Sequence, residues 1–97
     1  MIAYTVHCTI SDPEVAARWS AWITDTHIAD VCAAGALQGT LTALEGEPRR
    51  FEVCYLFTSQ RTFRRYETEH APRLRAEGLK AFPPELGIRY TRTIANL

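Results

Sequence analysis

The 97-residue chain has no apolar run near the roughly 20 residues that a membrane-spanning helix requires. Its three cysteines, Cys8, Cys32 and Cys54, are odd in number and form no C-x-x-C pair, which argues against a disulfide framework or a zinc site. Such cysteines are typical of buried free thiols. The first residues have neither the basic segment nor the cleavage site of a secretory signal. We therefore expect a cytoplasmic protein that is not bound to a membrane.

Signatures of several functional classes are also missing. There is no glycine-rich phosphate loop, no serine elbow and no Cys–His signature for covalent catalysis. The formal net charge is zero, and the segment 50–57 only faintly resembles an RNA-recognition strand. That segment has no glycine, and it places Glu52 where a phosphate would be repelled. We expect neither nucleic-acid binding nor a bound cofactor.

Four segments have the residue pattern of β-strands. Residues 2–10 alternate between apolar and polar side chains, and residues 36–45 do so more weakly. Residues 51–57 are apolar almost throughout, which is typical of a central strand, and residues 88–94 form the last strand.

Two helices are predicted between these strands. Ser11 or Asp12 can cap the first, which should run to about Ala34 and end before Gly35. Ser59 can cap the second, from about residue 60 to residue 81. Pro72 lies inside this helix, so we expect a kink near residues 70–72.

The predicted order is β-α-β-β-α-β in a single domain that spans residues 1–97. Two right-handed crossovers and one hairpin give an α+β, ferredoxin-like fold. Its four-stranded antiparallel sheet would have the strand order 4-1-3-2, with both helices on one face. The other face would carry part of the apolar strand 51–57, and an uncovered apolar face usually marks an interface. We therefore predict a homodimer in which two sheets pack face to face into a barrel.

Trp19, Trp22 and His27 form the most informative cluster, because the only two tryptophans share the first helix with a histidine. They could form the wall of an apolar pocket in which His27 acts as a general acid or base. The alternative is that both tryptophans belong to the core. His27 would then be a core histidine, hydrogen-bonded to a backbone carbonyl or to Asp30.

The second helix adds Tyr66, His70 and Arg73 as candidate ligand-binding residues. Tyr66 lies one turn before His70, and Arg73 or Arg75 could bind a ligand carboxylate. The alternative for both arginines is a solvated face of salt bridges. His27 and His70 should lie at similar heights and could share one cleft, where haem or metal binding is a minor alternative. A metal site would need a third ligand, which the sequence does not offer.

The chain also resembles a known group, the dimeric α/β-barrel superfamily, and within it a small bacterial family defined as a domain of unknown function. The resemblance covers nearly the whole chain. It is carried by the segment 1–6, Trp19-x-x-Trp22-x4-His27-Ile28, Ala33-Ala34-Gly35, and Tyr66-x4-Ala71-Pro72-x-Leu74-Arg75. It implies the fold and dimerisation. It implies no single reaction, because the superfamily includes cofactor-free monooxygenases, lactone isomerases, haem-handling enzymes and stress-response domains.

These observations predict a protein that binds a small apolar or aromatic ligand in a cleft between helices and sheet, without strong catalytic activity. The alternative is a cofactor-free enzyme of the monooxygenase or isomerase type, with His27 transferring a proton.

Overall fold

The computed structural model describes residues 1–97 and has the predicted element order, with each helical region divided into segments. The strands are β1 (Ile2–Ile10), β2 (Gln38–Leu44), β3 (Arg49–Phe57) and β4 (Arg89–Asn96). The helical segments are α1 (Pro13–Trp22), the π-helical turn η1 (Ile23–His27), α2 (Ile28–Ala33), α3 (Gln60–Glu69), α4 (Ala71–Ala81) and the 3-10 turn η2 (Pro84–Leu86). None of these helices has the length and apolar character needed to cross a membrane.

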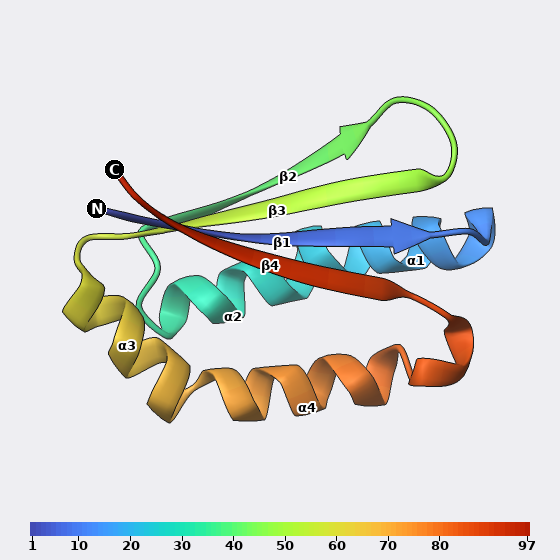
Figure 1. The fold of residues 1–97 in the computed structure, drawn as a ribbon. Helices are drawn as coiled ribbons and strands as arrows, with labels where there is room; N and C mark the ends of the chain where they lie inside the picture. Colours follow the sequence, from blue (N-terminus) through green and yellow to red (C-terminus); the bar gives the residue numbers. More distant parts are fainter.

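The four strands form one antiparallel sheet in the order β2-β3-β1-β4, which confirms the predicted order. Figure 1 shows every helix on the same side of the sheet, with α1 and α2 beside α3 and α4. The two ends of the chain meet where β1 pairs with β4, and the Leu97 backbone N–H donates to the Met1 carbonyl at 2.8 Å.

The strand register decides which side chains face the helices. Tyr4 of β1 pairs with Tyr55 of β3 and with Ile94 of β4. Val6, two residues further along β1, pairs with Val53 and with Arg92. Paired residues lie on the same face of a sheet. At these two positions of β1, the helix side of the sheet therefore carries tyrosines, valines, Ile94 and Arg92.

The first helical region is not the single α-helix that the sequence predicts. Asp12 caps α1 by accepting hydrogen bonds from the backbone N–H groups of Glu14 and Val15. The ladder then widens at η1, where the N–H of Ile28 donates to the carbonyl of Ile23, five residues earlier. Such π-helical turns insert one extra residue into a helix and are frequent at functional sites. The insertion shifts the direction in which His27 and α2 face.

The second helical region breaks where the kink is predicted. His70, with φ −124° and ψ −39°, lies between α3 and α4, and Pro72 follows in the first turn of α4. Proline has no N–H to continue the ladder, so the chain changes direction there. Figure 1 shows α3 and α4 meeting at a steep angle. This angle lets α3 cover one end of the sheet and α4 the other.

The face of the sheet away from the helices differs from the prediction. The buried side chains of β3, Val53, Tyr55 and Phe57, all face the helices. Cys54 and Leu56 are the main apolar groups of β3 on the opposite face. The expected large apolar patch is therefore small, because threonines occupy most of that face on the neighbouring strands. These open-face threonines are Thr5, Thr9, Thr40, Thr42, Thr91 and Thr93.

Candidate functional site

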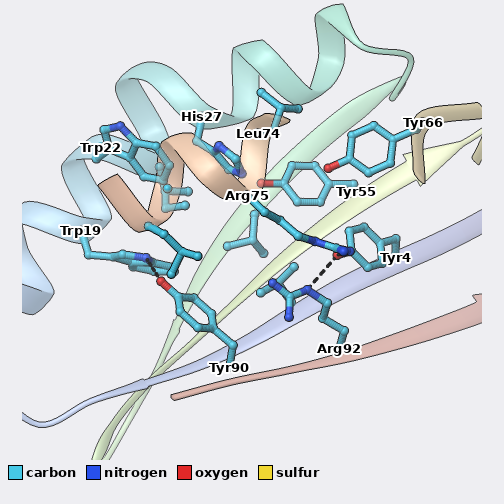
Figure 2. Close-up of a pocket in the computed structure, with 15 residues that line it drawn as sticks. Tyr4, Trp19, Trp22, His27, Tyr55, Tyr66, Leu74, Arg75, Tyr90 and Arg92 are labelled. Atoms are coloured by element: carbon cyan, nitrogen blue, oxygen red, sulfur yellow. Dashed lines mark hydrogen bonds between the residues drawn. The ribbon is translucent and has the colours of Figure 1, made fainter. Parts of the chain in front are cut away.

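A cavity of about 300 Å³ lies between the helices and the sheet. Its lining comes from α1, η1, α3 and α4 on one side and from β1, β3 and β4 on the other (Figure 2). The lining residues are Tyr4, Val6, Trp19, Trp22, Ile23, His27, Val53, Tyr55, Tyr66, Leu74, Arg75, Gly78, Leu79, Tyr90 and Arg92.

The mouth of the cavity lies between α4 and β4. The exposed members of the lining, Arg75, Leu79, Tyr90 and Arg92, all come from these two elements. β4 is the edge strand next to β1, and it is exposed along its whole length. The solvent-exposed side of the cavity therefore lies at this edge of the sheet.

The tryptophans form one wall, and each has a different role. Trp19 is 1% exposed, and its indole N–H donates to the hydroxyl of Tyr90 at 3.2 Å. It is thus a core residue whose polar atom is satisfied at the edge of the cavity. Trp22 is only half-buried and stacks on His27, with ring centroids 4.7 Å apart and planes at 21°. The two interpretations of the tryptophans both apply, because Trp19 belongs to the core and both residues line the cavity.

His27 faces the cavity without a hydrogen bond or ion pair to any protein group within the structure. Burial lowers the pKa of its imidazole, while the charges of Asp30 and Glu77 act in the opposite direction. The ring is therefore mainly neutral near pH 7, with one nitrogen able to accept a proton. The alternative of a core histidine bonded to Asp30 or to a carbonyl is not what the structure shows.

Two tyrosine hydroxyls reach the same space. Neither Tyr55 nor Tyr66 forms a side-chain hydrogen bond. Every fully buried side-chain nitrogen or oxygen atom in the structure has a partner, so these two hydroxyls are not fully buried. Both hydroxyls must therefore touch the accessible volume of the cavity. Burial raises the pKa of Tyr66 to about 12 and raises that of Tyr55 further, so both remain protonated donors near neutral pH. Figure 2 shows the Tyr55 hydroxyl pointing toward the ring of His27.

The close approach of β2 holds Tyr55 in place. A Cβ atom added to Gly39 would lie only 2.9 Å from ring atoms of Tyr55 and from Cγ2 of Ile28. Only glycine leaves room for this contact, so the Tyr55 ring is fixed between β2 and the first helical region.

At the mouth, two arginines converge on one hydroxyl (Figure 2). The Tyr4 oxygen accepts a hydrogen bond from Nε of Arg92 at 3.0 Å and from Nη2 of Arg75 at 3.4 Å. Neither guanidinium has a carboxylate within 4.0 Å, and no aspartate or glutamate lines the cavity. The mouth therefore carries positive charge that is not neutralised by an ion pair.

The structure brings four of the six predicted site residues together. Trp19, Trp22, His27 and Tyr66 line the cavity, whereas His70 and Arg73 do not. His70 occupies the break between α3 and α4, where its backbone N–H donates to the Tyr66 carbonyl at 3.0 Å.

Arg73 lies on the outer face of α4, exposed to solvent, and its Nη1 atom is 3.5 Å from Glu77. Arg73 thus belongs to a solvated salt bridge, which was the alternative to ligand binding. No group of three His, Cys, Asp or Glu side chains is placed to hold a metal ion. The expected cleft shared by His27 and His70 is absent, because the break at His70 moves that residue away from the cavity.

The sequence interpretation missed Arg92, and it named Arg73 in preference to Arg75 as a candidate ligand-binding residue. A signal for each was present. Arg75 lies four residues after the buried Ala71 and three before Gly78, which is the spacing of one helix face. Arg92 has the same strand parity as Tyr90, so both point toward the same side of β4.

The sheet order and the one-sided helices define a ferredoxin-like α+β protein. The chain belongs to the family of the domain of unknown function DUF4286, whose family model matches residues 1–92. No curated protein matches the sequence significantly.

Several solved structures share this fold at low sequence identity. A proposed antibiotic biosynthesis monooxygenase from Deinococcus radiodurans has a TM-score of 0.73 and 13% identity, over 100% of this chain and 92% of that one. SnoaB, a cofactor-independent oxygenase from Streptomyces nogalater, has a TM-score of 0.69 and 12% identity, over 99% and 91% of the two chains. A dimeric ferredoxin-like protein from an uncultured marine organism has a TM-score of 0.69 and 12% identity, over 100% and 94%. At these identities the likeness shows the fold.

Proposed function

We propose that this protein binds one small aromatic molecule in the cavity between helices and sheet, without strong catalytic activity. The observation that carries the proposal is an open cavity of about 300 Å³ with mainly apolar walls. Preformed, mostly apolar pockets with a few convergent polar groups are the usual form of small-molecule sites. The His27 ring, which stacks on Trp22 and lines the cavity, gives a planar ligand ring a flat surface to pack on.

Tryptophan fluorescence tests this proposal, because both tryptophans line the cavity. We expect saturable quenching by members of a panel of small aromatic acids and quinones. The quenching should weaken in His27→Ala and persist in His70→Ala, a matched control that removes a histidine outside the cavity. Absence of quenching by every compound, with both tryptophans shielded from acrylamide, would refute the proposal.

A second candidate function is a cofactor-free enzyme, and the unpartnered neutral imidazole of His27 favours it. In this mechanism a His27 nitrogen takes a proton from an acidic O–H or C–H group of the bound aromatic compound. The electron pair stays on the compound as an anion delocalised over the ring, which the arginines at the mouth stabilise. Reaction of that anion with O₂ would give an oxygenase, and return of the proton at another carbon would give an isomerase. SnoaB, described as a cofactor-independent oxygenase on the same fold, supports the first of these outcomes.

Oxygen uptake and isomer formation test this second function on any compound that quenches the tryptophans. Turnover that is lost in His27→Gln, while binding in that variant is retained, would establish proton transfer by His27. Binding without turnover between pH 6 and 9 would leave the first function alone.

We also propose a homodimer in which the partner is a second copy of this chain, packed on the open sheet face. A polar cluster lies at the centre of that face, where His7 contacts Glu52 at 3.5 Å and Thr93 at 3.1 Å. A structure of the same fold is described as dimeric, which supports the proposal. Light scattering should give about twice the 11.0 kDa chain mass. A mass of one chain at micromolar concentration would contradict it.

A further inference from the structure

We propose that the cavity is selective for an aromatic carboxylate, whose anionic group is bound at the mouth by Arg75 and Arg92 (the arginine pair) together with the Tyr4 hydroxyl. The inference rests on the proposed function, because it specifies the class of molecule that the cavity takes.

The mouth of the cavity carries unbalanced positive charge. Nε of Arg92 and Nη2 of Arg75 both lie within 3.4 Å of one phenolic oxygen, so two positive groups are held close together. Like charges held near one another repel, and no carboxylate of the protein lies within 4.0 Å of either guanidinium group. Glu67 is the acidic residue whose charge acts on Arg75, but its carboxylate forms a salt bridge with Arg64 at 2.7 Å. A bound anion would supply the missing negative charge.

The polar groups available at the mouth are hydrogen-bond donors. Guanidinium groups donate and never accept, and the Tyr4 oxygen already accepts from both arginines. The Tyr4 O–H proton is therefore free to donate as well. Several donors from β1, α4 and β4 thus meet at one point, which matches the two acceptor oxygens of a carboxylate better than a single neutral oxygen.

This donor cluster lies across the cavity from the apolar wall. Figure 2 shows the arginine pair on one side of the cavity and the Trp22–His27 stack on the other. A ligand whose ring packs on the stack would place its carboxylate at the mouth, partly in water, where the desolvation cost of the charge is small. The hydroxyl of Tyr55 lies between these two ends, and Tyr66 lines the cavity beside Tyr55, so both can donate to further oxygen atoms of the ring.

The test compares two probes of the same shape by isothermal titration calorimetry, 2-naphthoate and its neutral analogue 2-naphthamide. We expect wild-type protein to bind the naphthoate at least tenfold more tightly than the amide. Arg75→Gln and Arg92→Gln should each weaken naphthoate binding roughly tenfold while changing amide binding less than twofold. Raising NaCl from 50 mM to 500 mM should weaken binding of the naphthoate only, since both arginines are exposed to solvent.

Two exposed arginines are matched controls. Arg73 is on the same helix as Arg75 but on its outer face, and Arg89 is on the same strand as Arg92 but points to the opposite face of the sheet. Arg73→Gln and Arg89→Gln should bind both probes like wild type. A second variant, Tyr4→Phe, should give an intermediate loss for naphthoate alone, and thermal melting shows whether each variant is folded.

The outcomes separate this inference from the function on which it rests. Equal binding of both probes, unchanged in the two cavity variants, would overturn the carboxylate preference and leave aromatic binding intact. Equal losses of naphthoate affinity in the cavity variants and the controls would mean that only the net charge of the protein matters. This result would also overturn the carboxylate preference. No binding of either probe up to 1 mM, together with no quenching by the wider panel, would overturn both.

Discussion

Gly78 lies at a position where a small side chain should raise the stability of the protein and a large one should fill its cavity. The residue lies in the interior of α4 and lines the cavity, and its backbone is not in the left-handed region. A Cβ atom added there would meet Cη2 of Trp22 at 3.5 Å, which is an ordinary van der Waals contact. Alanine therefore fits the native backbone without strain.

The magnitude follows from helix propensity. Glycine in a helix interior is less favourable than alanine by about 0.8–1.0 kcal/mol. Gly78→Ala should raise the free energy of unfolding by about that amount, and the melting temperature by roughly 4–8 °C for a domain of this size. Gly78→Leu would place a branched side chain inside the cavity. Its overlap with a bound ligand should cost about 1–3 kcal/mol, which is a loss of affinity of roughly 5- to 150-fold.

Urea unfolding and calorimetric titration with 2-naphthoate measure the two effects on the same samples. The control is Ala76→Gly, on the exposed side of α4, which should lower stability by about 1 kcal/mol and leave binding unchanged. A Gly78→Ala protein that unfolds more easily than wild type would refute the reasoning on fit. A folded Gly78→Leu protein that binds the probe as tightly as wild type would show that the ligand lies elsewhere.

Three further predictions concern buried groups. Burial lowers the pKa of His27, so the unfolded chain binds a proton at higher pH than the folded protein does. The free energy of unfolding should therefore fall as the pH drops below about 6.5, and His27→Gln should reduce this fall in urea titrations at pH 7.5 and 5.5. Trp19→Ala should cost about 3–5 kcal/mol in the same assay, because the indole is 1% exposed; a loss below 1 kcal/mol would contradict its place in the core. Burial raises the pKa of Cys8 to about 12, so iodoacetamide and mass spectrometry should find it unmodified in the native protein and labelled in urea. Native labelling of Cys8 as fast as that of the half-buried Cys54 would contradict this.

Much of the architecture could be predicted because local pattern and packing agree. The alternation in residues 2–10 corresponds to β1, and the apolar run 51–57 corresponds to the central strand β3. Pro72 ends one helical ladder wherever the surrounding chain lies, so the break at His70 was predictable from its neighbours alone. The π-helical turn at Ile23–His27 was not, since no residue there breaks a helix on its own.

Part of the candidate site could also be predicted from the sequence, and part could not. Trp19, Trp22 and His27 lie within nine residues of one another, so helix geometry was enough to group them. Arg75, Arg92 and Tyr4 come from three elements and meet only because β1 lies between β3 and β4 and α4 passes the sheet edge. The helix spacing of Arg75 is a weak signal in the sequence. Its contact with the Tyr4 hydroxyl is what separates it clearly from Arg73.

The amino-acid sequence by itself determined the element order, the break at Pro72 and the aromatic character of the first helix, because these depend on backbone chemistry and short-range periodicity. Only the tertiary structure decided that the open sheet face is rich in threonine, that His70 lies away from the cavity, and that two unpaired arginines share the Tyr4 hydroxyl. Those features depend on strand register and on the angle between helices, which arise from contacts between residues as many as 88 positions apart.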